Sequence, residues 1–171
     1  MDIQENIVNK VAQSGLLTID LATYAPKEDI QVYDIKNNLF HGLLLKEKDF
    51  RTFIKEHDWS QYAGVHIGII CSTDAIVPTW AYMLLANKLE PYAISVHFGD
   101  KDTVLENLFL QRLDSIDYSR FQDERVVVKG CGDIYIPETA FIKFTLGLSK
   151  VAKSMMYGEP CSTVPVFKRK S

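Results

Sequence analysis

The feature that most constrains this fold is a regular alternation of short apolar runs and longer amphipathic segments after residue 65. The apolar runs 65–71, 93–98 and 125–129 predict buried strands, because they are short and rich in Val and Ile. Strands that alternate with helices form β-α-β units, whose strands pair in parallel through right-handed crossovers. The alternation therefore predicts a parallel C-terminal sheet over residues 65–168, with helices packed on it.

The segments between these runs have the spacing of helices. They predict helices over 76–90, 103–116 and 137–157, and a last short strand over 164–167. In the last helix, apolar side chains recur every three or four residues, which predicts a buried stripe. The stripe consists of Phe141, Phe144, Leu148, Val151 and Met155.

The N-terminal third has a different pattern. Three apolar or alternating runs with turn residues between them predict an antiparallel meander, with strands at 16–21, 30–35 and 39–45. Helices are expected at 3–14 and 46–57. The predicted fold class is α/β, with a mixed sheet made of an N-terminal antiparallel meander and C-terminal parallel β-α-β units. A length of 171 residues favours a single α/β domain over 1–171.

Charge and composition exclude several classes of partner. A net charge of −3 and a pI of about 5.8 provide no broad basic field, so we expect no nucleic acid and no membrane as partners. No run approaches the roughly 20 apolar residues of a membrane helix. The three cysteines are an odd number, and the first residues lack a signal peptide. We therefore expect a cytoplasmic protein with reduced thiols.

A cysteine or histidine lies at or just past the end of each of the three expected parallel strands, and an aspartate follows it two or three residues later. The pairs are Cys71 with Asp74, His97 with Asp100, and Cys131 with Asp133. Ligands of open α/β sheets bind beyond the carboxyl ends of the strands, where these residues are predicted to lie. Thiolate and imidazole are ligands that zinc and iron prefer. The candidate metal ligands are Cys71, His97, Cys131 and Cys161.

Each of these residues also has a purely structural interpretation. Free cysteine is among the most buried residue types, so Cys71 is equally typical of a core position. His97 is typical of a histidine that hydrogen-bonds locally, and Asp74 and Asp100 are typical helix N-caps. Neighbouring strands lie about 4.8 Å apart, so Cys71 and Cys131 can share a metal ion only if their strands are adjacent or their loops converge. The sequence leaves both interpretations open.

Cys131 is the candidate catalytic residue, because Gly130 and Gly132 open the backbone on both sides of it. A helix starting near Pro137 favours its thiolate, whereas Asp133 opposes it. A tight turn with a cysteine that merely fits is the alternative. Cys161 lies in a polar loop with two prolines, and a direct parallel crossover predicts that loop at the opposite edge of the sheet.

Several segments together resemble a family of uncharacterised bacterial proteins catalogued as domain of unknown function 2480. They are IVNKVAQSGL (7–16), LKEKDFR (45–51), HDWSQY (57–62), CSTDAIVPTWAY (71–82), KGCGD (129–133) and GEPCSTVP (158–165). The resemblance covers nearly the whole chain but implies no activity or catalytic residues. Genes of this family often lie near iron–sulfur cluster assembly genes, so the resemblance implies an iron–sulfur assembly partner.

Two hypotheses follow. The first is a thiol- or metal-dependent accessory in iron–sulfur or sulfur metabolism, which uses Cys131 with Cys71, His97 or Cys161. Its metal would be zinc or iron. The second is a non-enzymatic, homo-oligomeric interaction domain, a homodimer, with structural cysteines. The chain has no phosphate-binding glycine fingerprint, no Gly-x-Ser-x-Gly and no His-Glu-x-x-His, so the sequence leaves open whether it is an enzyme.

Overall fold

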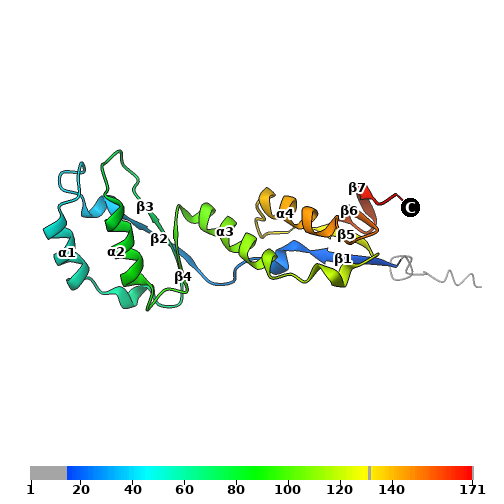
Figure 1. The fold of residues 1–171 in the computed structure, drawn as a ribbon, viewed down its shortest axis with the longest axis horizontal. Helices are drawn as coiled ribbons and strands as arrows, with labels where there is room; N and C mark the ends of the chain where they lie inside the picture. Colours follow the sequence, from blue (N-terminus) through cyan, green and yellow to red (C-terminus); the bar gives the residue numbers. More distant parts are fainter. Residues whose placement is uncertain (1–14, 131, 171) are drawn as a thin grey trace, which may run out of the picture. The chain divides into compact units, whose positions relative to one another are not determined.

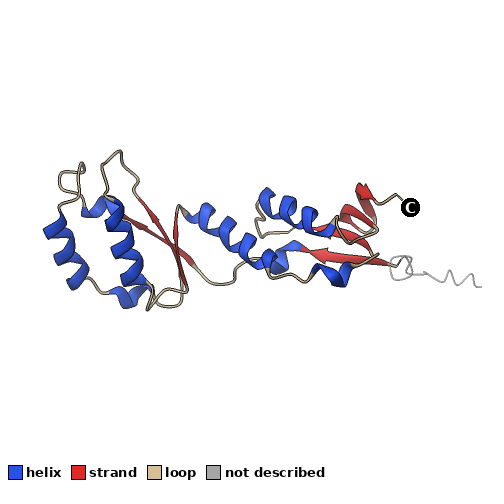
Figure 2. Ribbon diagram, viewed as in Figure 1, coloured by secondary structure: helices blue, strands red, loops and turns tan. Residues whose placement is uncertain are grey.

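The computed structural model describes residues 15–130 and 132–170, so the expected helix over 3–14 lies outside the described residues. The chain divides into two compact units. Unit 1 consists of residues 1–25 and 109–171, and unit 2 consists of residues 26–108. Each unit has a sheet and helices of its own (Figure 1; Figure 2). The single domain over 1–171 stays a prediction.

Unit 2 contains a three-stranded parallel sheet in the order β2-β3-β4. Its strands are β2 (Ile30–Asp34), β3 (His66–Ile70) and β4 (Ser95–Phe98). Helix α1 (Glu47–Glu56) lies between β2 and β3 along the chain, and α2 (Thr79–Leu89) lies between β3 and β4. The helices at 46–57 and 76–90 and the strands at 65–71 and 93–98 are therefore confirmed, with small shifts at their ends.

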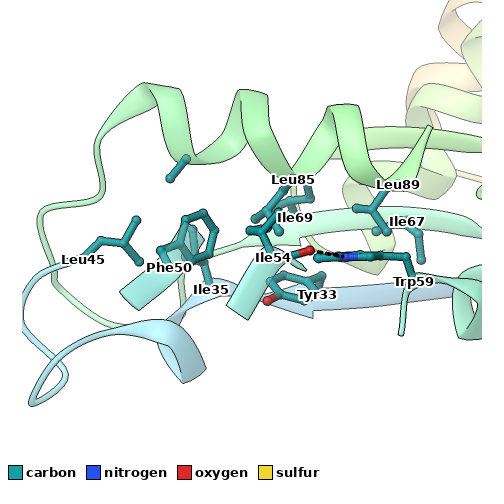
Figure 3. Packing of buried hydrophobic residues seen from close by; sticks show 11 residues of the cluster. Tyr33, Ile35, Leu45, Phe50, Ile54, Trp59, Ile67, Ile69, Leu85 and Leu89 are labelled. Carbon is teal, nitrogen blue, oxygen red and sulfur yellow. Dashed lines mark hydrogen bonds between the residues drawn. The ribbon is translucent and has the colours of Figure 1, made fainter. Parts of the chain in front are cut away.

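One face of this sheet packs against α1 and α2 to form the core of unit 2 (Figure 3). Ile67 and Ile69 are two residues apart on β3, so both side chains point to this face. Phe50 of α1 and Leu85 of α2 are buried against them. The indole Nε1 of Trp59 donates a hydrogen bond of 2.9 Å to the carbonyl oxygen of Ile54. Residues 66, 68, 95 and 97 consequently belong to the opposite face.

Unit 1 contains a four-stranded sheet in the order β1-β5-β6-β7. Its strands are β1 (Leu16–Asp20), β5 (Arg125–Lys129), β6 (Ser154–Glu159) and β7 (Ser162–Lys168). The first three are parallel, and β7 runs antiparallel to β6. Helix α4 (Glu138–Leu148) connects β5 to β6, and the boundary between the units, at residue 108, falls within α3 (Lys101–Asp114).

The predicted N-terminal meander is wrong. β1 pairs in parallel with β5, and β2 pairs in parallel with β3, so the two strands belong to different sheets. Residues 39–45 form a turn with two isolated bridges, and His41 and Gly42 have the positive φ angles of a turn. An apolar run predicts a strand but not the partner of that strand, which is why the meander failed.

The parallel sheet over residues 65–168 is also wrong as a single sheet. β3 and β4 belong to unit 2, whereas β5 belongs to unit 1. The expected helix over 137–157 ends at Leu148, and its last residues form β6 instead. Phe144 and Leu148 are buried on α4, but Met155 is buried on a strand. The predicted helix was too long because Met155, a buried residue of β6, continues the spacing of three or four residues between the apolar side chains of α4.

Candidate functional site

The carboxyl ends of the three parallel strands of unit 1 carry charged residues that interact. Asp20, Lys129 and Glu159 are the last residues of β1, β5 and β6. The ammonium Nζ of Lys129 lies 3.8 Å from Oδ2 of Asp20 and 3.6 Å from Oε1 of Glu159. One cation therefore lies between two carboxylates at this edge of the sheet.

Two cysteine-bearing segments follow the strands that end at this edge. Cys131 comes two residues after the end of β5, and Cys161 comes two residues after the end of β6. The strands end nearly in register, since Val128 pairs with Tyr157. Cys131 itself lies outside the described residues. Cys161 is a free, exposed thiol in the turn between β6 and β7.

The position of Cys161 differs from the one expected for a direct crossover. That expectation assumed that the chain returns from the last helix straight into the final strand. Instead, β6 lies between the last helix and the final strand and runs parallel to β5. The turn that contains Cys161 therefore begins at the carboxyl edge of the sheet. The opposite edge expected for Cys161 is therefore wrong, because Cys161 follows the end of β6 at the same edge as the end of β5.

The two glycines that flank Cys131 in sequence have different surroundings. A Cβ atom added to Gly130 would lie 2.6 Å from Cζ of Phe141 and 2.7 Å from Cδ1 of Ile136. A Cβ atom added to Gly132 would meet nothing within 4 Å. Gly130 is therefore required by close packing against the start of α4, which begins after Pro137 as expected. Asp133 is exposed and does not cap that helix.

The other predicted site residues belong to unit 2. Cys71 directly follows β3, is half-buried and packs against the core, and its thiol donates to the carbonyl oxygen of Thr73 at 3.5 Å. His97 is the next-to-last residue of β4, within the strand expected at 93–98. Asp100 accepts hydrogen bonds from the backbone N and Oγ1 of Thr103 at 2.9 and 2.7 Å, as expected of a cap.

The capping expectation for Asp74 is wrong, because α2 begins at Thr79 after Pro78. The loop that contains Asp74 is instead tied to the end of β2. The backbone N and the hydroxyl of Ser72 donate to the two carboxylate oxygens of Asp34 at 3.1 and 2.5 Å. Burial raises the pKa of Asp34, but the hydrogen bonds from Ser72 and Lys36 outweigh it and lower the pKa.

The predicted metal ligands are divided between the units, with Cys71 and His97 in unit 2 and Cys161 in unit 1. Within 15–130 and 132–170, no three Cys, His, Asp or Glu side chains are grouped so that they could hold a metal ion. Because Cys131 lies outside these ranges, the ligand set stays a prediction.

The comparison with protein families agrees with the resemblance found in the sequence. The model of the family described as "Protein of unknown function (DUF2480)" matches residues 5–169, nearly the whole chain. The chain belongs to the DUF2480 family. No curated protein and no solved structure matches it significantly.

None of the described helices of this DUF2480 protein is long and apolar enough to cross a membrane.

A second polar group in this DUF2480 protein was missed by the sequence analysis. On the face of the unit 2 sheet opposite the core, Oγ of Ser95 lies 2.7 Å from Nδ1 of His66 and 2.7 Å from Nε2 of His97. His66 and Ser95 are the first residues of neighbouring strands and are paired in register. Only the two-residue spacing of Ser95 and His97 was visible in the sequence. The pairing with His66, 29 residues away, was not.

Proposed function

We propose that this DUF2480 protein is a cytoplasmic, thiol-dependent accessory in sulfur or iron–sulfur metabolism, and that unit 1 carries its reactive edge. One observation carries the proposal. The parallel pairing of β5 and β6 brings the ends of both strands to one edge, and a cysteine follows each strand end by two residues. Cys131 is the proposed nucleophile, and Cys161, whose thiol is exposed, is the second thiol.

The edge carries a charged group of its own. Lys129, at the end of β5, is paired with the carboxylates of Asp20 and Glu159. The thiolate is the reactive form of cysteine. The reaction we propose is sulfur transfer. The thiolate attacks the outer sulfur of a donor persulfide, the sulfur–sulfur bond of the donor breaks, and the donor leaves as a thiolate.

The test uses the full chain and three single variants, Cys131→Ser, Cys161→Ser and Cys71→Ser. Each is treated with inorganic polysulfide, and the mass gain of sulfur atoms is measured on the intact protein. We expect Cys131→Ser to lower the rate of sulfur uptake at least about 10-fold, because thiolate reactivity follows the local environment. Cys161→Ser should lose the second uptake. Cys71→Ser is the matched control, since Cys71 packs against the core of unit 2, and it should react as the wild type does.

The proposal fails if the double variant Cys131→Ser/Cys161→Ser takes up sulfur at the wild-type rate. Zinc or iron in the protein as isolated, lost from the Cys161→Ser variant, would support the metal-dependent form of the same proposal.

A specific observation favours the homo-oligomeric alternative. Ile142 and Leu146 lie one turn apart on α4 and are 60% and 61% exposed. Apolar side chains that share one helix face and remain exposed are typical of an interaction surface. Three unreactive thiols in the polysulfide experiment, together with a concentration-dependent dimer in sedimentation, would favour this alternative over the thiol function.

A further inference from the structure

The serine–histidine group of unit 2 has the geometry of an activated hydroxyl. The hydroxyl oxygen of Ser95 is within hydrogen-bond distance of two imidazole nitrogens, one on β3 and one on its own strand. His66 is only 4% exposed, whereas Ser95 and His97 are half-buried. A serine that has one hydroxyl proton donates to only one of the two rings, so the other ring must donate to Ser95.

Glu28 decides which ring accepts the proton. Oε2 of Glu28 lies 3.6 Å from Nε2 of His66, and the same oxygen accepts a hydrogen bond of 3.0 Å from the backbone N of Lys27. Nε2 of His66 is buried and has no other polar neighbour within hydrogen-bond length in the described chain. A carboxylate beside Nε2 favours a proton on that nitrogen. Nδ1 of His66 is then the acceptor of the Ser95 proton.

His97 takes the complementary role. Since Ser95 donates to His66, Nε2 of His97 must carry a proton and donate it to the oxygen of Ser95. Burial, and then the nearby His66, lower the pKa of His97, so the ring is neutral near pH 7. A donor to the serine oxygen stabilises the negative charge that develops when the hydroxyl loses its proton.

We propose that Ser95 is a nucleophile toward small carboxylic esters, with His66 as general base, Glu28 as the residue that positions His66, and His97 as hydrogen-bond donor to the reacting oxygen. A nucleophile that is hydrogen-bonded to a base, and a base oriented by a third group, are the parts that covalent acyl transfer needs. This site lies within unit 2 and is independent of the thiol function proposed for unit 1.

The reaction needs only an ester and water. Ser95 Oγ attacks the carbonyl carbon while its proton passes to Nδ1 of His66. The carbon–oxygen bond to the alcohol breaks, and the alcohol leaves with the proton from His66. Water then attacks the acyl-serine, gives one proton to His66, and releases the carboxylic acid as Ser95 regains its proton. Nothing is oxidised or reduced in either half.

Ser95 lies on an edge strand. Among the described strands, β4 pairs with β3 alone. Alternate backbone N–H groups of an edge strand point away from the sheet and have no strand partner. Such groups beside a nucleophile are the donors that an ester carbonyl oxygen requires when it becomes negatively charged.

The first experiment treats the full-length protein with diisopropyl fluorophosphate and locates the label by peptide mass spectrometry. We expect one label per chain, on Ser95, formed as the serine oxygen displaces fluoride. A label on any other residue, or no label, overturns the proposal. This measurement needs no variant and therefore does not depend on whether a substituted protein folds.

The second experiment measures hydrolysis of p-nitrophenyl acetate. Ser95→Ala should lower kcat/KM at least about 100-fold, because both the nucleophile and its base-catalysed step are lost. Ser115→Ala is the matched control and should be unchanged, since its hydroxyl donates to the backbone carbonyl of Arg112 in unit 1. A Ser95→Ala variant within twofold of the wild type overturns the proposal.

The role of Glu28 requires a different measurement, because Glu28 acts through His66. Glu28→Gln should lower kcat about 10-fold and leave KM unchanged, since a base that is held less well still binds the ester but removes the proton more slowly. Glu28→Asp, which keeps the carboxylate, should recover part of kcat. Equal changes in both variants would contradict the positioning role.

Discussion

Both units have three parallel strands, to which unit 1 adds the antiparallel strand β7, but the two units place polar side chains differently. In unit 1 the charged residues and the cysteine turn follow the carboxyl ends of the strands, where α/β folds usually bind ligands. In unit 2, His66 and Ser95 are the first residues of β3 and β4, and Oγ of Ser95 lies within hydrogen-bond distance of both His66 and His97. Nε2 of His66 has no hydrogen-bond partner in the described part of the chain. The rule that ligands bind at the carboxyl ends of strands pointed to the cysteine edge of unit 1 from the sequence alone. The group of Ser95, His66 and His97 in unit 2 is visible only once the pairing of β3 with β4 is known.

The largest expected effect concerns the cores. Phe144 of unit 1 is completely buried, so Phe144→Ala should lower the free energy of unfolding by about 3–5 kcal/mol. Urea unfolding followed by circular dichroism measures the loss. Ile142→Ala on the same helix is the matched control, and its loss should stay below about 1 kcal/mol because that side chain is exposed. If unit 2 unfolds separately from unit 1, Phe144→Ala will shift only one of two transitions.

A loss below about 1 kcal/mol for Phe144→Ala would mean that the α4 stripe makes a weak contact. The comparison between the units would then change, because unit 1 would lack the dense core that unit 2 has around Phe50.

A smaller effect is expected at the glycines beside Cys131. Gly130→Ala should cost about 1–3 kcal/mol, because its new methyl group would collide with Phe141 and Ile136. Gly132→Ala should be nearly neutral, since the space around it is open. Thermal unfolding of the two variants provides the measurement. Equal losses would contradict the assignment of Gly130 to close packing and would point to a backbone requirement shared by both glycines.

Local elements were predictable from the sequence to the extent that their apolar pattern was unbroken. The strand 125–129 was predicted with its observed bounds, because Val126, Val127 and Val128 form a fully apolar run between polar residues. β6 was missed because Met155 continues the helical spacing of Phe144 and Leu148. Local patterns therefore identify helices and strands, but they do not show where a helix ends when the next strand continues its apolar spacing.

Long-range pairing was not predictable, and it determines both candidate sites. Cys161 reaches the edge of β5 only because β6 pairs with that strand, and His66 reaches Ser95 only through the register of β3 and β4. Histidine and serine at such positions have no local signal, since each is compatible with an ordinary polar strand end. The sequence could propose cysteines and aspartates at strand ends but could not say which strands are neighbours.

The smallest expected effect is the change of stability with pH that comes from the titration of His97. It sharpens the contrast between the partly buried Ser95–histidine group of unit 2 and the charged edge of unit 1. The pKa of His97 is lowered below its usual value of 6.5, first by burial and then by His66. The folded protein therefore binds this proton less readily than the unfolded chain, so stability is present above pH 6.5 and falls as the pH drops through the folded-state pKa.

Histidine NMR between pH 8 and pH 4.5 should show His97 titrating below 6.5. His97→Gln, which keeps a donor for Ser95 but does not titrate, should reduce the loss of stability on acidification. An ordinary or raised pKa for His97 would mean that water or a carboxylate reaches the ring, and that it is not the neutral donor to Ser95 that the esterase proposal requires.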